Sequence, residues 1–234
     1  FLKSKRIMGI QGIDTRDLTK HIRDHGEQQG IISTVDADHQ SLVSKAKSAT
    51  GLEGKDLVKE VTCQKTYKWE ETEMFPDAEN GKAHDQPKHN KNYKVIVYDC
   101  GVKYNILRKL RNHNCDVTVV PASTSAEKVL SLEPDGILIS NGPGDPAAVP
   151  YMVENVTNLI GKKPVFGICL GNQILALALG YKTYKLKFGH HGGNQPVMDL
   201  RTKKVEITAQ NHCFAIDGES VNNALDSRFG RVEV

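Results

Sequence analysis

Apolar residues follow two different spacings along the second half of the chain, and these spacings predict strands and helices in alternation. Short apolar runs predict buried strands at 94–98, 116–120, 136–140 and 164–168. Apolar residues at helical spacing predict helices that include 106–110, 126–130, 152–160 and 170–179. Apolar strands that alternate with helices favour an α/β fold, in which helices cover both faces of an open, mostly parallel sheet.

The first part of the chain carries two weaker helix signals. Asp14 stands where a helix N-cap belongs, an acidic residue follows three positions later, and Leu18 and Ile22 then share one face. Residues 42–49 show a second amphipathic pattern. Neither segment contains a pattern of residues that indicates chemistry.

The composition changes sharply between these two parts. Residues 76–92 contain no aliphatic side chain larger than alanine. Because such a stretch has too little apolar surface to form a core, we predict a solvated linker. We therefore predict a smaller N-terminal domain in residues 1–75, a linker in 76–92, and a second domain in 93–234.

Composition and charge exclude several classes of protein. Apolar residues make up 38% and charged residues 25% of the 234 residues, which is typical of a globular chain. The net charge of +3 is spread along the sequence without a basic, aromatic-rich stripe, so we expect no nucleic-acid partner. The longest aliphatic run, Ile174 to Leu179, is far shorter than the roughly 20 residues of a membrane span, so we expect no membrane partner.

The five cysteines form no disulfide or zinc pattern. Their number is odd and no CxxC pair occurs, which fits a reducing compartment. We expect three of them, Cys63, Cys100 and Cys115, to be inert thiols.

Cys169 stands in a pattern typical of a nucleophile. The sequence Gly167-Ile168-Cys169-Leu170-Gly171 joins a predicted strand to a predicted helix and has the form of a nucleophile elbow, with Cys in place of Ser. A helix N-terminus favours negative charge and therefore thiolate. The backbone N–H of Leu170 would face a developing oxyanion. The alternative is a buried structural cysteine at a glycine-rich turn.

A second glycine-rich loop follows a neighbouring strand. Residues 140–146 read SNGPGDP and predict an unusual backbone path with exposed amide groups. It is not a Walker loop, because no Gly-Lys-Ser/Thr follows. Both loops should meet at the carboxyl edge of the sheet, where Gly144 and Leu170 could offer two oxyanion donors. A plain turn is the alternative.

Two further polar segments lie near the C-terminal end. Residues 210–214, QNHCF, follow a predicted strand at 205–208 and could contact a polar substrate. His190 and His191 lie in FGHHGGNQP, residues 188–196. No acidic or cysteine partner stands at ligand spacing, so we expect no metal site and predict a turn held by histidine hydrogen bonds.

These segments together resemble a known family. PVFGICLGNQ (164–173) and SNGPGDP (140–146) resemble the nucleophile elbow and the oxyanion loop of class I glutamine amidotransferases, which carry a Cys-His-Glu triad. IDTRDLTKHIRDHG (13–26), KTYKLKFGHHGGNQPV (182–197) and ITAQNHCFAID (207–217) are similar to the small chain of glutamine-hydrolysing carbamoyl-phosphate synthetase. The resemblance covers essentially the whole chain, and it implies that the smaller N-terminal domain is also of the α/β class.

The resemblance implies a ligase component that supplies ammonia. In this family the cysteine, here Cys169, attacks the side-chain amide of glutamine, ammonia leaves, and the resulting thioester is hydrolysed to glutamate. The ammonia passes to a large synthetase chain, separate or fused, that uses ATP, Mg and bicarbonate to make carbamoyl phosphate for arginine and pyrimidine biosynthesis. The small chain itself carries no cofactor, and the resemblance implies a cytoplasmic or organellar location.

The resemblance also assigns roles to individual positions. Cys169 matches the nucleophile, while Leu170 and Gly144 match the oxyanion donors. The resemblance implies that glutamine is also contacted by Gly144 and Leu170. The other positions that match the family's glutamine contacts are Gly142, Gln173, Asn211, Cys213 and Phe214.

The sequence departs from the family pattern in several places. The family's base lies in a His-Pro-Glu motif, which does not occur in these 234 residues, and a serine contact is expected before Phe1. We therefore expect a fragment that lacks both ends of the small chain and does not turn over glutamine alone. Cys213 replaces a family glycine and would distort the substrate contact if its φ were positive. Asn172 replaces a histidine, which we expect to be benign.

Two other functions remain open at this point. The chain could be a non-catalytic subunit that stabilises a synthetase, or another class I amidotransferase that serves anthranilate or purine synthesis. The intact Cys169 elbow argues against the first, and the N-terminal segment argues against the second.

Overall fold

The computed structural model describes residues 1–72, 91–222, 226–227 and 229–232. Of the predicted linker, residues 76–90 lie outside the described residues. The chain divides into two compact units, which we name by their main feature. The hairpin unit comprises Phe1–Leu52 and Lys185–Cys213, and the sheet unit comprises Glu53–Tyr184 and Phe214–Val234.

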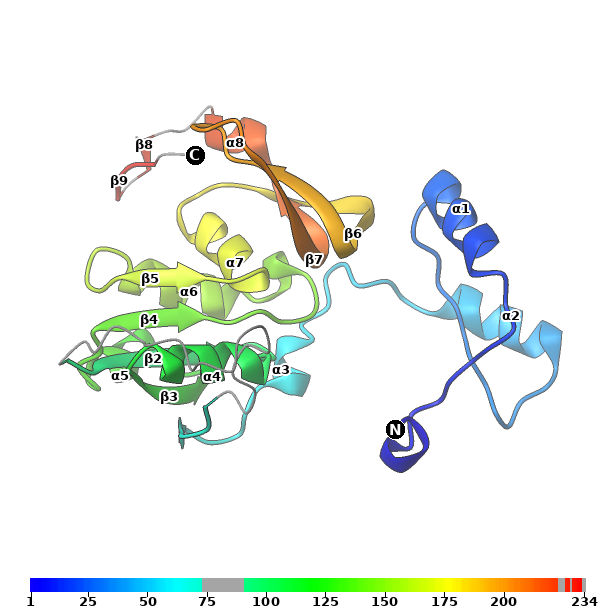
Figure 1. Ribbon diagram of the computed structural model, residues 1–234, viewed down its shortest axis with the longest axis horizontal. Helices are drawn as coiled ribbons and strands as arrows, with labels where there is room; N and C mark the ends of the chain where they lie inside the picture. Colours follow the sequence, from blue (N-terminus) through cyan, green and yellow to red (C-terminus); the bar gives the residue numbers. More distant parts are fainter. Residues whose placement is uncertain (73–90, 223–225, 228, 233–234) are drawn as a thin grey trace, which may run out of the picture. The chain divides into compact units, whose positions relative to one another are not determined.

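A five-stranded sheet forms the centre of the sheet unit, in the order β1-β3-β2-β4-β5 (Figure 1). Its strands are β1 (Tyr67–Trp69), β2 (Tyr93–Asp99), β3 (Cys115–Pro121), β4 (Gly136–Ile139) and β5 (Val165–Gly167). The last four run parallel, and β1 pairs antiparallel with β3. The predicted open, mostly parallel α/β sheet is therefore confirmed.

Helices cover both faces of this sheet. The helices of the sheet unit are α3 (Val58–Val61), α4 (Tyr104–Asn112), α5 (Ala126–Leu130), the 3-10 turn η2 (Pro146–Ala148), α6 (Pro150–Leu159), α7 (Leu170–Ala178) and α8 (Gly218–Asn222). One apolar core joins Ile96 and Tyr98 of β2 to residues of α3, α5, α6 and α7. The other joins Val97 of β2 to Leu107 of α4. Alternate residues of one strand thus enter opposite cores, as the pleat requires.

The carboxyl ends of β2, β3, β4 and β5 lie at one edge of the sheet because these strands are parallel. The backbone N–H of Ile168 donates to Ile139 O at 3.0 Å, and that of Ser140 donates to Tyr98 O at 3.2 Å. The segments that follow β4 and β5 therefore begin side by side.

The hairpin unit is built mainly on a long β-hairpin and two helices. Its elements are η1 (Lys3–Lys5), α1 (Thr15–His25), α2 (His39–Ser48), and most of β6 (Thr183–Met198) and β7 (Val205–Ile216), which pair with each other. Asp14 caps α1 as predicted, since its carboxylate accepts the backbone N–H of Asp17 at 2.9 Å. After α1, Glu27 forms an ion pair with Lys185 at 2.6 Å.

Three features differ from the sequence-based expectations. Residues 188–196 lie within β6, so the predicted turn is wrong, although histidine side chains do hydrogen-bond there. The strand predicted at 205–208 extends to Ile216. Residues 53–72, which we assigned to the N-terminal segment, pack in the sheet unit and supply α3 and β1. The domain boundaries stay a prediction.

Among the described residues, the longest helices fall well short of a membrane span in length and apolar character.

Candidate functional site

Cys169 lies at the bend between β5 and α7. Its φ of 53° and ψ of −110° place a non-glycine residue in a sparsely populated backbone region. Such a conformation costs about 1–3 kcal/mol and persists only where the surrounding structure imposes it. The sharp strand-to-helix bend that the sequence predicts is therefore present, with the cysteine at its turning point.

The flanking glycines are required by close backbone contacts. A Cβ on Gly167 would lie 2.4 Å from Gly171 O, and a Cβ on Gly171 would lie 2.1 Å from Ile139 O. Neither gap admits a methyl group, because every near neighbour is backbone or the rigid β4 strand. The two glycines let α7 begin directly against β4 and β5, and they hold Cys169 at the sheet edge.

The thiol of Cys169 is partly buried. Burial raises its pKa above the ordinary value of 9.0, while a hydrogen bond from the backbone N–H of Leu170 acts in the opposite direction. The expectation of an acidic thiol at this position is therefore not met, because desolvation outweighs the hydrogen bond from Leu170. The Leu170 N–H donates to the sulfur of Cys169, and its role as an oxyanion donor stays a prediction.

The loop that follows β4 packs directly against this elbow. A Cβ on Gly142 would lie 2.0 Å from Cys100 O and 2.9 Å from Leu170 Cδ2, so Gly142 fits tightly between the β2 end and α7. Gly144 has a φ of 91°, and a Cβ there would meet Lys55 O at 3.0 Å. The structure thus brings Gly142 and Leu170 together. The second oxyanion donor at Gly144 stays a prediction.

Polar side chains hold this loop in place. Ser140 is fully buried, and its hydroxyl accepts from Cys100 N at 2.9 Å and donates to Asn141 O at 2.8 Å. Asn141 Oδ1 accepts from Lys103 N at 3.0 Å. Asp145 Oδ2 accepts from Gly54 N at 3.0 Å. The sequence analysis did not predict these side chain–backbone hydrogen bonds, although a serine at a strand end often bonds to nearby backbone groups.

Two predicted glutamine contacts meet inside the sheet unit. Gln173 on α7 is buried, and its Nε2 donates to Phe214 O at 2.6 Å. Phe214 itself is 4% exposed. This bond ties α7 to the end of β7, so both residues have a structural role in the protein as described.

The two other predicted contacts, Asn211 and Cys213, belong to the hairpin unit. Asn211 Oδ1 lies 2.7 Å from His191 Nδ1, and Cys213 Sγ lies 3.8 Å from His191 Nε2. The φ of Cys213 is not positive, so replacing the family's glycine causes no backbone strain. The proposed distortion at Cys213 therefore does not arise.

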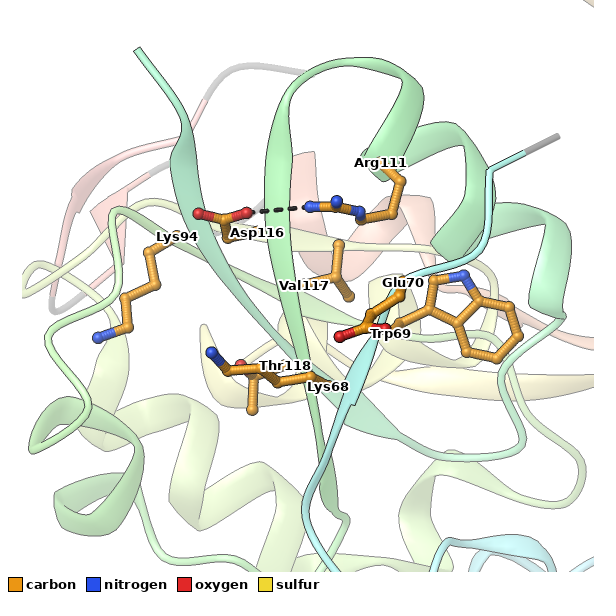
Figure 2. A pocket seen from close by; sticks show the side chains of 8 residues that line it. All are labelled: Lys68, Trp69, Glu70, Lys94, Arg111, Asp116, Val117 and Thr118. Atoms are coloured by element: carbon orange, nitrogen blue, oxygen red, sulfur yellow. Dashed lines mark hydrogen bonds and ion pairs between the residues drawn. The ribbon is translucent and has the colours of Figure 1, made fainter.

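Three cavities of the sheet unit lie away from Cys169. One of about 290 Å³ opens beside the beginnings of β2 and β3, where Arg111 pairs with Asp116 at 2.9 Å (Figure 2). Cavities of about 340 Å³ and 450 Å³ are lined by residues that include Cys63. None of these three is lined by Cys169, so none coincides with the predicted site.

His190 and His191 belong to no metal-binding group among the described residues. The part of the chain that the structure describes holds no group of three His, Cys, Asp or Glu side chains suited to a metal ion. A His-x-Glu sequence does occur at His25–Glu27, but Glu27 is paired with Lys185 and His25 Nδ1 lies 3.0 Å from His21 O. That segment belongs to the hairpin unit, whereas Cys169 belongs to the sheet unit.

Two family models match the chain. The model described as glutamine amidotransferase class-I matches residues 96–229, which include every predicted site residue. The model described as carbamoyl-phosphate synthase small chain, CPSase domain, matches residues 1–32.

The chain is also similar to individual proteins. The carbamoyl phosphate synthase small chain of Syntrophotalea carbinolica is 56% identical over 95% of this chain and 58% of its own length. The chloroplastic carbamoyl phosphate synthase small chain of rice is 46% identical over 94% of this chain and 48% of its own length. This chain therefore spans about half the length of these relatives. The crystal structure of a glutamine amidotransferase from Thermotoga maritima is similar, with a TM-score of 0.40, 17% identity, and coverage of 54% of this chain and 63% of that one.

Proposed function

The chain belongs to the class I glutamine amidotransferase family, and from that premise we propose that it is the glutamine-hydrolysing component of a carbamoyl-phosphate synthetase. The observation that carries this proposal is Cys169, which is held in a strained backbone conformation with the Leu170 N–H at its sulfur. The match of residues 1–32 to the small-chain model and the 56% identity to a small chain support the choice within the family.

The proposed chemistry begins at the Cys169 sulfur. The thiolate attacks the side-chain amide carbon of glutamine, and the amide oxygen becomes an oxyanion that the Leu170 N–H stabilises. Gly144 is the proposed second donor. The base that took the thiol proton returns it to the amide nitrogen, the C–N bond breaks and ammonia leaves, and water then hydrolyses the thioester to give glutamate and the free thiol.

A base must take the thiol proton in this mechanism. Burial raises the pKa of Cys169, so the thiol stays protonated at neutral pH until that base acts. The resemblance assigns this step to a histidine–glutamate pair. A partly buried, protonated thiol is a poor target for unselective reagents, which gives this arrangement selectivity for a bound substrate.

Recognition of glutamine is proposed for the residues that the family resemblance identifies. Gly142 lies against the elbow, and the Gln173–Phe214 bond fixes the adjoining wall of α7. Asn211 and Cys213 are the further contacts that the resemblance assigns. To contact glutamine, Gln173 must exchange its hydrogen bond to Phe214 O for one to the ligand. Without that exchange, Gln173 only holds α7 in position.

The proposed partner is a large synthetase chain that accepts the ammonia. That chain would use ATP, Mg and bicarbonate, and its product would enter arginine and pyrimidine biosynthesis. The rice relative carries the word chloroplastic in its name. For this chain we propose a cytoplasmic or organellar location.

The test measures carbamoyl phosphate formation by the full-length protein in complex with its large chain, from glutamine and separately from ammonia. We expect Cys169→Ala to abolish the glutamine-dependent rate and to leave the ammonia-dependent rate unchanged. Cys63→Ala is the matched control and should retain both rates. A glutamine-dependent rate that survives in Cys169→Ala would refute the assignment. A wild-type complex that uses only ammonia would instead indicate a non-catalytic subunit.

A further inference from the structure

In the hairpin unit, Cys213 lies next to a histidine that is itself hydrogen-bonded to an asparagine. Cys213 Sγ lies 3.8 Å from His191 Nε2, and His191 Nδ1 lies 2.7 Å from Asn211 Oδ1. A thiol, an imidazole and an orienting side chain in this order have the connectivity of a Cys-His-Asn triad.

The hairpin register explains why these three side chains meet. Side chains alternate between the two faces of a strand, so Asn211 and Cys213 of β7 share one face. His191 of β6 reaches both of these side chains, since its Nδ1 lies 2.7 Å from Asn211 Oδ1 and its Nε2 lies 3.8 Å from Cys213 Sγ. His190 points the other way and meets His212, with 3.3 Å between His190 Nδ1 and His212 Nε2.

The imidazole of His191 is held in a defined position and tautomer. Its ring packs on Gly189, because a Cβ there would lie only 2.5 Å from His191 Nε2. Asn211 Oδ1 is an acceptor, so His191 Nδ1 must carry the proton in this hydrogen bond. The lone pair of Nε2 is then left toward Cys213, where it can accept the thiol proton.

The other four thiols lack this environment. Burial raises the pKa of Cys63 to about 11 and that of Cys100 to about 12, and it also raises the pKa of Cys115 and Cys169. Cys213 is only partly buried, and His191 is exposed. The thiol next to the imidazole is therefore accessible to small reagents from solvent.

From this geometry we propose that Cys213 is a modification site, a thiol that His191 and Asn211 activate for exchange with small disulfides such as oxidised glutathione. His191 Nε2 takes the thiol proton, and Cys213 Sγ attacks one sulfur of the disulfide. A new S–S bond forms to Cys213 while the original S–S bond breaks. The departing thiolate takes up the proton, so Cys213 is oxidised and the departing sulfur is reduced.

This reaction does not depend on glutamine hydrolysis, although Asn211 and Cys213 are also proposed glutamine contacts. It uses only residues of the hairpin unit, and it requires neither Cys169 nor bound glutamine. A failure of the proposed glutaminase function would therefore leave this inference standing, and the reverse also holds.

The test follows the reaction of the folded chain with a chromogenic aromatic disulfide at neutral pH and maps the modified peptides by mass spectrometry. We expect Cys213 to react first, and Cys213→Ser to abolish that fast phase while Cys169→Ser retains it. We expect His191→Ala to slow the fast phase roughly tenfold or more, since it removes a general base. His190→Ala, on the opposite face of the same strand, is the matched control and should keep the rate.

A structural effect of His191→Ala can be separated from loss of the base. Added imidazole should restore part of the lost rate to His191→Ala and should leave the wild-type rate nearly unchanged. The inference is overturned if Cys63 or Cys169 reacts before Cys213. It is also overturned if His191→Ala reacts as fast as the wild type, or if imidazole restores nothing while circular dichroism shows a native fold.

Discussion

The substitution Gly171→Ala tests the steric basis of the elbow. The added Cβ would lie 2.1 Å from Ile139 O and 2.7 Å from Ile139 C, both of which belong to the backbone of β4. An ordinary contact is at least 3.4 Å, so the first turn of α7 and the end of β4 must separate by roughly 1 Å or more. This movement would strain the bond from Ile168 N to Ile139 O, which is 3.0 Å long.

Two opposing effects set the magnitude. Alanine is favoured over glycine in a helix by about 1 kcal/mol. Forcing a methyl group against fixed backbone costs about 3 kcal/mol, at the upper end for overpacking. The net loss of unfolding free energy is therefore about 2 kcal/mol, which lowers Tm by about 4–8 °C for a chain of this size.

Urea unfolding followed by far-UV circular dichroism measures this loss. Gly136→Ala in β4 is the control, because its added Cβ would meet nothing nearer than Pro164 O at 3.9 Å. The control should change the unfolding free energy by less than about 0.5 kcal/mol. If Gly171→Ala proves as stable as Gly136→Ala, α7 does not begin against β4 as described, and the reasoning about the elbow is wrong.

Three further predictions concern the same sheet edge. Cys169→Gly should be about 1–2 kcal/mol more stable than Cys169→Ala in urea unfolding, because glycine adopts the φ of 53° without strain; equal stabilities would contradict a strained elbow. Ser140→Ala should lower the unfolding free energy by about 2 kcal/mol, because it leaves the buried Cys100 N–H without its acceptor at 2.9 Å, whereas the exposed Ser131→Ala should change it little. Burial raises the pKa of Cys100 from 9.0 to about 12, so between these values the unfolded chain loses a proton that the folded chain keeps, and stability falls as pH rises. In Cys100→Ala, the unfolding free energy measured across that pH range should fall less steeply with rising pH than in the wild type. An unchanged slope would show that Cys100 does not cause the alkaline loss of stability.

Hydrophobic spacing was sufficient to predict most of the sheet unit. The apolar runs at 94–98 and 116–120 correspond to β2 and β3, and the glycine pattern around Cys169 corresponds to the observed bend. Both signals are local, because a strand buried on both faces must be apolar and a close backbone crossing must be glycine.

Other features depend on contacts that no local pattern reveals. Residues 188–196 are rich in glycine and histidine, which have weak strand preference, yet pairing with β7 makes them part of β6. The raised pKa of Cys169 reflects how deeply the thiol is packed, whereas the sequence reveals only its place at a helix N-terminus. The approach of His191 to Cys213 depends on the hairpin register, which a sequence without turn signals does not specify.

Covalent labelling tests most directly whether Cys169 is the nucleophile for glutamine. The reagent is a glutamine analogue in which a chloromethyl ketone replaces the side-chain amide, and peptide mass spectrometry locates the label. We expect the label on Cys169, protection of Cys169 by excess glutamine, and no glutamine-protected label in Cys169→Ala. Labelling that avoids Cys169, or that excess glutamine does not reduce, would contradict its assignment as the nucleophile.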